Sequence, residues 1–163
     1  MPPKAPLKPT AEQLAKWSIS EAEPLQLLAC YDGFSDNVLQ ALAATPDGKQ
    51  FVVGGARLSL WNVGDAEPLK DLLADKKNEQ VERPILAAAT SPDGTLLAAG
   101  DNDGRLFAWK LSDHSEVFAI KAHEGRLTQL AFSPDSKTIA TTGYNGEVRL
   151  WQTADGATIK VIK

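Results

Sequence analysis

Few residues of this chain could carry acid–base, nucleophilic or metal chemistry. The 163 residues include two histidines, His114 and His123, and a single cysteine, Cys30. Two imidazoles and one thiol cannot supply the spaced ligand set of a zinc site. Their positions also suggest no Cys–His pair or Ser–His–acid triad, and Gly54-Gly55 is too short to cradle a phosphate. We therefore expect no catalytic residue, no metal and no cofactor, and we predict that the chain is not an enzyme.

Composition narrows the range of partners. The formal charge is −4, which gives no electrostatic footprint for nucleic acid or an anionic membrane surface. No apolar run approaches the roughly 20 residues that cross a bilayer. The first ten residues, MPPKAPLKPT, lack the apolar segment of a secretory signal. We expect a single-domain protein of the cytoplasm that contacts neither nucleic acid nor membrane.

Two markers recur together along the chain. Tryptophans occur at intervals of 42 to 48 residues, and the sequence Ala-Glu-Pro-Leu follows each of the first two. A turn of the type Ser/Thr-Pro-Asp-Gly/Ser occurs three times and moves with them, and proline and aspartate both favour turns. Two markers that share one period indicate tandem repeats. The markers are Trp17, Trp61, Trp109 and Trp151, and the turns at 45–48, 91–94 and 133–136.

Each repeat divides into four short apolar runs separated by turn residues, which is typical of antiparallel strands. Many runs are apolar at consecutive positions, which favours sheets buried on both faces. The first two strands are rich in alanine and glycine and would suit a crowded axis, with the tryptophan strand further out. The expected strands are 38–44, 50–53, 57–62 and 69–73; 85–90, 95–99, 105–111 and 117–120; and 127–132, 137–142, 147–152 and 158–162.

These residues resemble the WD-repeat (WD40) β-propeller family. The third repeat matches its pattern best, with His123, the run AFSPDSKTIATT, Asn145-Gly146 and VRLW. The resemblance covers about residues 17–163. It implies an all-β fold of antiparallel four-stranded blades, with about three complete blades and a partial one at the N-terminus. The implied divisions are a flexible Pro/Lys-rich arm at 1–12, a partial blade at 13–28, and blades at about 38–73, 85–120 and 127–163.

Two features of this division leave alternatives open. Residues 11–16 could instead form a helix that Thr10 caps, because Gln13 lies three positions further on. Three and a half blades do not close a propeller, which has about four to eight. The chain is then either part of a longer propeller or one of two copies that close a ring together.

The resemblance also implies a hydrogen-bonded network inside each blade. In the third repeat it would join His123, Thr141, Asn145 and Trp151, and Asn145 replaces the usual aspartate, which weakens the bond. His123 would then be structural rather than a ligand or a base. The other repeats keep fewer members, so we expect the third blade to be the most firmly held. The residues retained elsewhere are Asp103 and Trp109 in the second repeat and Trp61 in the first.

A candidate partner face lies at one end of the blades. The long connection 75–83 would share that end with the turns between the second and third strands, where the family usually docks peptides and proteins. Aromatic and arginine contacts would then recognise a partner segment. The candidate residues are Lys76, Lys77, Arg83, Asn102, Arg126 and Tyr144.

The function that this resemblance implies is a non-catalytic scaffold, which presents a rigid propeller face for protein–protein interaction with a partner of unknown identity. An alternative is a propeller segment of a longer enzyme, redox protein or sensor that acts as its docking domain. A third possibility is a propeller enzyme of another repeat family, such as the quinone-binding type. The recurring Pro-Asp turns favour the first interpretation.

Overall fold

The computed structural model describes residues 39–65, 67–73 and 84–163. In this part of the chain every regular element is a β-strand. No helix there is long and apolar enough to cross a membrane. The arm at 1–12, the partial blade at 13–28 and the alternative helix at 11–16 all lie outside the described residues.

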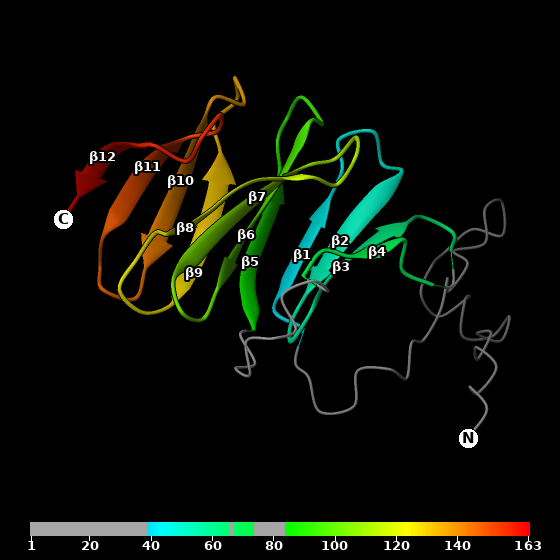
Figure 1. The fold of residues 1–163 in the computed structure, drawn as a ribbon, viewed down its shortest axis with the longest axis horizontal. Coiled ribbons are helices and arrows are strands. Elements are labelled where there is room, and N and C mark those ends of the chain that lie inside the picture. Colours follow the sequence, from blue (N-terminus) through cyan, green and yellow to red (C-terminus); the bar gives the residue numbers. More distant parts are fainter. Residues whose placement is uncertain (1–38, 66, 74–83) are drawn as a thin grey trace, which may run out of the picture.

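Twelve strands form three separate four-stranded antiparallel sheets, each a meander in which consecutive strands are neighbours (Figure 1). This confirms the predicted fold class, and the observed strands end within three residues of the expected positions. Blade 1 consists of β1 (Ala41–Ala44), β2 (Gln50–Gly54), β3 (Leu58–Asn62) and β4 (Lys70–Asp71). Blade 2 consists of β5 (Ile85–Thr90), β6 (Leu96–Asp101), β7 (Arg105–Lys110) and β8 (Glu116–Lys121). Blade 3 consists of β9 (Leu127–Phe132), β10 (Thr138–Gly143), β11 (Val148–Gln152) and β12 (Thr158–Ile162).

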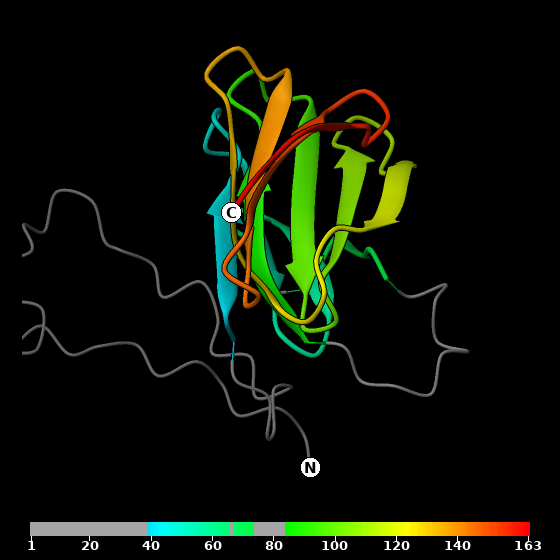
Figure 2. The ribbon, with the colours of Figure 1, turned by 90° about the vertical axis from the view of Figure 1, so that its left-hand side faces the viewer.

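The blades stand side by side in an open array (Figures 1 and 2). Their first strands adjoin one another, because β5 lies against both β1 and β9. Each tryptophan of the described repeats lies on the third strand of its blade, two strands away from this row. The small residues of the first strands therefore occupy the crowded side of the array, as the sequence predicts.

The Pro-Asp turns hold one end of every blade in the same way. In blade 2 the Ser91 hydroxyl donates to an Asp93 carboxylate oxygen at 2.6 Å, and the same oxygen accepts from the Thr95 amide at 3.0 Å. The equivalent hydroxyl bonds at Asp47 and Asp135 are also 2.6 Å long. We call this end, at the top of Figure 1, the Pro-Asp end, and the other end the His123 end.

Two apolar layers fill the spaces between the blades, and blade 2 contributes to both. Toward blade 1 it presents Leu97 and Phe107, and toward blade 3 it presents Ala98 and Leu106, all at most 3% exposed. Alternate residues of one strand thus point to opposite layers, which explains the consecutive apolar positions. Blade 2 has neighbours on both faces, whereas blade 3 has a described neighbour on one face only. Among the described residues, blade 2 is therefore the blade that contributes to both apolar layers. That the third blade is the most firmly held stays a prediction.

Glycines admit the closest approach between blades. Ile85 begins β5 and packs over Gly54 of blade 1, where an added Cβ would lie 2.7 Å from the Ile85 Cγ2. Leu127 begins β9 and packs over Gly100 of blade 2, where an added Cβ would overlap the leucine side chain. Ile85 and Leu127 are both fully buried. Blades 2 and 3 are therefore each docked on the preceding blade by an aliphatic side chain that packs over a glycine.

Candidate functional site

A buried hydrogen-bond network closes the His123 end of blade 3. The Trp151 indole Nε1 donates to Thr141 Oγ1 at 2.8 Å, and His123 Nε2 lies 2.8 Å from the same oxygen. The next acceptor for the Thr141 hydroxyl, the Arg149 carbonyl, is 3.5 Å away. Because an indole nitrogen can only donate, the geometry favours a Thr141 hydroxyl that donates to Nε2. The hydrogen of the neutral imidazole then resides on Nδ1.

The Nδ1 side of His123 is less well satisfied. Asn145 lies beside it across Gly143, where an added Cβ would overlap both side chains, yet Nδ1 has no hydrogen bond of standard geometry. Burial lowers the pKa of His123, and the charge of Arg149 lowers it further, against the opposing effects of Asn145 and Glu147. The ring is 1% exposed and neutral at pH 7. Its contact with Thr141 joins the loop before β9 to β10.

In blades 1 and 2 the tryptophan stacks on a phenylalanine ring, whereas in blade 3 the tryptophan belongs to the hydrogen-bond network. Trp61 is 6% exposed and stacks on Phe51, with the ring centroids 6.0 Å apart. Trp109 is 3% exposed and stacks on Phe107 at 5.7 Å. The position that Thr141 occupies in blade 3 is Ala99 in blade 2, which offers no hydroxyl. Trp109 thus lies in the apolar layer between blades 1 and 2, whereas Trp61 is not part of that layer and packs on the Phe51 ring.

The turn of blade 2 contains a buried carboxylate, Asp101, that the sequence analysis did not single out beside Asp103. Asp101 is fully buried at the end of β6, whereas Asp103 is only partly buried. One Asp101 oxygen accepts from the backbone amides of Asp103 and Arg105, at 2.9 and 2.8 Å. Its other oxygen, Oδ2, has no hydrogen-bond partner. Burial raises the pKa of Asp101, because an ionised carboxylate loses its hydration there.

A signal for Asp101 exists in the sequence. The run Asp101-Asn102-Asp103-Gly104 joins two strands, and an aspartate at the start of a turn commonly accepts from backbone amides further along it. Comparison with the family pattern selected Asp103, because the asparagine of the third repeat aligns with that position. The turn geometry, rather than the aligned motif, decides which carboxylate is buried.

The partner-face residues that the structure describes gather at the His123 end. The Tyr144 amide donates to the Arg126 carbonyl at 2.9 Å, and the Asn102 amide donates to the Pro84 carbonyl at 3.0 Å. The Gly104 carbonyl accepts from the amides of Ala122 and His123, at 2.8 and 2.9 Å. These bonds join the turn of blade 2 to the loop that leads into blade 3.

The exposure of these side chains differs. Tyr144 is 79% exposed, the Arg126 residue is exposed, and Asn102 is partly buried. The exposed residues Tyr144 and Arg126 are thus joined through their backbones. Lys76, Lys77 and Arg83 lie outside the described residues, so they remain predictions from the sequence.

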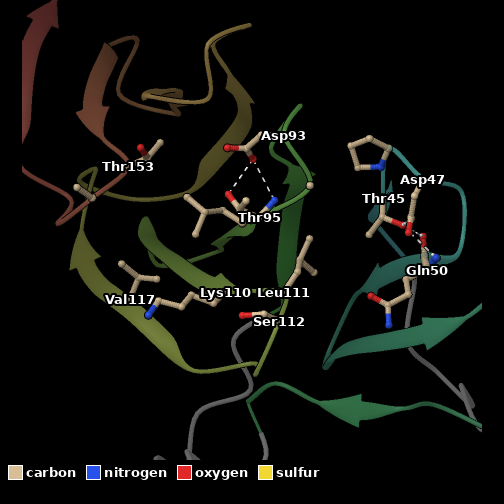
Figure 3. Close-up of a pocket in the computed structure, with 14 residues that line it drawn as sticks. Thr45, Asp47, Gln50, Asp93, Thr95, Lys110, Leu111, Ser112, Val117 and Thr153 are labelled. Atoms are coloured by element: carbon tan, nitrogen blue, oxygen red, sulfur yellow. Dashed lines mark hydrogen bonds between the residues drawn. The ribbon is translucent and has the colours of Figure 1, made fainter.

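The opposite end carries a cleft that sequence reasoning did not find. It has a volume of about 700 Å³ and is lined by turns of all three blades. Figure 3 shows it extending from Thr153 on one side to Gln50 on the other, with Lys110 and Ser112 between them. Hydroxyl and amide hydrogen bonds lower the pKa of both Asp47 and Asp93, so their carboxylates are ionised at neutral pH.

This cleft could hold an extended segment of polypeptide, and its mixed charges give it no strong preference for one sign. Among the described residues, no three histidine, cysteine or acidic side chains group as metal ligands. Sequence signals for the cleft are weak, because its lining comes from turns that are more than 100 residues apart in the chain.

Comparison with known proteins finds two repeats. The pattern of the family "WD domain, G-beta repeat" matches residues 78–110 and 114–152, which include most of blades 2 and 3. Protein groucho of Drosophila melanogaster is 28% identical over 145 residues, which is 86% of this chain and 19% of that protein. The target of rapamycin complex subunit wat1 of Schizosaccharomyces pombe is 27% identical over 105 residues, covering 61% of this chain and 32% of that protein. The guanine nucleotide-exchange factor SEC12 of Mus musculus is 33% identical over 110 residues, covering 68% and 24%. The matches thus span between about a fifth and a third of these relatives.

The His123 network predicts a specific dependence of stability on pH. The folded-state pKa lies below the ordinary value of 6.5, so the unfolded chain takes up a proton first as the pH falls. The free energy of unfolding should be at its highest above pH 6.5, as far as His123 determines it. Below that pH it should decrease by at most about 1.4 kcal/mol per pH unit. Urea unfolding between pH 7.5 and 5 measures this.

The variant His114→Asn should keep this slope, because residue 114 lies in a turn at the Pro-Asp end and has φ of 60°, which asparagine tolerates. The variant His123→Gln should reduce the slope. A slope that is carried by His114, or that has the opposite sign, would contradict the assignment.

Asp101 predicts a stabilising substitution. Asp101→Asn keeps an oxygen for the two amides and removes a buried charge, so it should raise the free energy of unfolding at pH 7 by an amount on the order of 1 kcal/mol. The folded-state pKa of Asp101 is raised, so the unfavourable charge disappears at low pH and the gain should shrink at pH 4.

Asp135→Asn is the matched contrast, because hydrogen bonds lower the pKa of that turn carboxylate. This variant should be less stable than the parent at pH 7. If both variants change stability in the same direction at pH 7, the burial of the Asp101 charge does not explain the effect of Asp101→Asn.

Proposed function

Because this chain contains repeats of the WD40 family, we propose that it is a non-catalytic scaffold whose His123 end binds a protein partner. The observation that carries the proposal is the exposed Tyr144 ring beside Arg126, on a backbone that hydrogen bonds join to the network at His123. A tyrosine on a rigid frame supplies contact area at low cost in conformational entropy. The site therefore suits recognition of a polypeptide surface rather than chemistry on a small molecule.

The comparisons support this proposal in a general way. One relative is named as a subunit of a complex. Another relative, SEC12, is named as a guanine nucleotide-exchange factor. For this chain we infer binding only, because the histidine described at this end, His123, is buried.

The proposal extends to residues that the sequence alone assigns. Lys76, Lys77 and Arg83 would border the same end and add positive charge beside Arg126. Residues 1–12 would form a linking arm, and residues 13–28 would add the outer strands of a further blade. In this arrangement the chain is part of a larger propeller that acts as a docking unit.

The test compares the two ends of the blades. The tagged chain is used to capture partners from an extract of its source cells, followed by mass spectrometry, and each captured protein is then measured with purified variants. The pair Arg126→Glu and Tyr144→Ala should weaken binding about tenfold or more, as expected for the loss of a central aromatic or arginine contact.

Lys110→Glu in the cleft at the Pro-Asp end is the control, since it changes a charge at the opposite end by the same amount as Arg126→Glu. It should leave binding unchanged. Loss of binding in Lys110→Glu with none in the first pair would move the site to the Pro-Asp end and overturn the proposed face.

A further inference from the structure

The turn between β10 and β11 contains an asparagine that is chemically unlike the others in the chain. Of the five asparagines in the sequence, only Asn145 is followed by a glycine. Asn145 and Gly146 are both exposed, and the φ of Gly146 is 78°. Because glycine has no side chain, nothing shields its backbone nitrogen from the asparagine side chain that precedes it. Asparagine is a thermolabile residue, and this pair is the one most open to self-reaction.

The reaction exchanges the side-chain amide for a carboxylate. The deprotonated backbone nitrogen of Gly146 bonds to the Asn145 Cγ, the Cγ–Nδ2 bond breaks, and ammonia leaves. Water then adds to Cγ of the resulting succinimide ring, the bond from Cγ to the Gly146 nitrogen breaks, and that nitrogen regains its proton. The net change converts asparagine and water to aspartate and ammonia, with no oxidant or reductant. Addition of water to the main-chain carbonyl instead gives isoaspartate.

The turn restrains the two reacting groups only lightly. Neither Asn145 nor Gly146 belongs to a strand. The Gly146 amide donates to the Gly143 carbonyl at 3.0 Å, and the Asn145 Oδ1 accepts from the Glu147 amide at 3.4 Å, which is long for a hydrogen bond. Local opening of an exposed turn costs much less than unfolding of the chain. The reaction therefore proceeds in the folded protein, although more slowly than in the unfolded chain.

A buried donor lies beside the side chain that changes. His123 Nδ1 is buried without a hydrogen bond of standard geometry, and the Asn145 side chain lies next to it across Gly143. Since Thr141 occupies Nε2, the ring hydrogen is on Nδ1 and requires an acceptor. Either oxygen of a carboxylate can accept it, in a bond roughly twice as strong as one to a neutral amide. Asn145 is exposed, so the new charge stays hydrated.

The charged groups around His123 accommodate a second carboxylate. Among the described residues, the charges that act on the ring are those of Arg149 and Glu147. Glu147 is already paired, with Arg149 at 2.6 Å and with Lys163 at 3.3 Å. The turn of blade 2 contacts this loop through its backbone, at the Gly104 carbonyl. A carboxylate at residue 145 would thus meet a neutralised neighbour and a ring N–H.

We propose that Asn145 is a site of spontaneous deamidation, and that its aspartate product binds the His123 imidazole and stabilises the His123 end as the protein ages. The isoaspartate product does not do this, because its main chain is one methylene longer and its carboxylate is attached to Cα. The modification adds one negative charge next to Tyr144 and is irreversible without a repair enzyme. This inference does not depend on which partner the His123 end binds.

Peptide mass mapping of the purified chain, incubated at mildly alkaline pH, tests the chemical step. The peptide that contains Asn145 should gain the mass difference between a hydroxyl and an amino group. The peptide that contains Asn62 is the internal control, because Val63 follows it and its side chain donates to Asp65 at 2.8 Å. It should keep its mass over the same period. If the Asn145 peptide reacts no faster than the Asn62 peptide, the proposal is wrong.

The variant Asn145→Asp tests the consequence for the network. The carboxylate should raise the pKa of His123 above that in the parent, as measured by NMR titration. The unfolded chain then gains less from protonation below pH 6.5, so the urea midpoint at pH 6 should be higher than that of the parent. The incubated parent should shift toward the midpoint of this variant.

The same substitution in a His123→Gln background is the control, since it removes the ring that the carboxylate binds. There Asn145→Asp should give no increase in the urea midpoint. An equal increase in both backgrounds would show that the gain does not come from His123. A lower midpoint in Asn145→Asp, or in the incubated parent, would also overturn the proposal.

Discussion

The array depends on the insertion of one aliphatic side chain per blade over a glycine of the preceding blade. Ile85 over Gly54 and Leu127 over Gly100 set how closely the sheets approach, and the two apolar layers assemble around these points. The constraint is steric, and protein interiors are too densely packed to absorb an extra methyl group without cost. Its consequence is that each blade is stable only through its neighbours, as in other repeat proteins.

The two ends of the blades differ in their polar contacts. Ionised aspartates tie the turns at the Pro-Asp end. At the His123 end, among the described residues, both His123 Nδ1 in blade 3 and Asp101 Oδ2 in blade 2 lack a hydrogen bond of standard geometry. The rigid backbone at this second end positions Tyr144 beside Arg126. The fold alone does not identify the partner. Because hydrogen bonds hold the backbone at the His123 end, binding of a partner there would require little rearrangement.

The sequence predicted the strands well because two kinds of local signal coincide. Pro-Asp turns and tryptophans repeat with one period, and strand position follows from turn chemistry. The predictions were weaker where contacts between blades decide the outcome. The burial of Asp101 depends on the shape of one turn, and the cleft at the Pro-Asp end depends on three turns that are distant in sequence. The network of blade 3 is visible in the sequence, whereas the burial of both faces of blade 2 is not.

The central claim, that glycine-mediated insertion holds the array together, is tested most directly by the unfolding free energy of Gly100→Ala. The added Cβ would overlap Leu127, so urea denaturation should show a loss of about 1 to 3 kcal/mol, as for other overpacked interiors. Alanine is otherwise favoured over glycine in a strand interior, because it restricts the unfolded chain. A variant that is as stable as the parent, or more stable, would contradict the account.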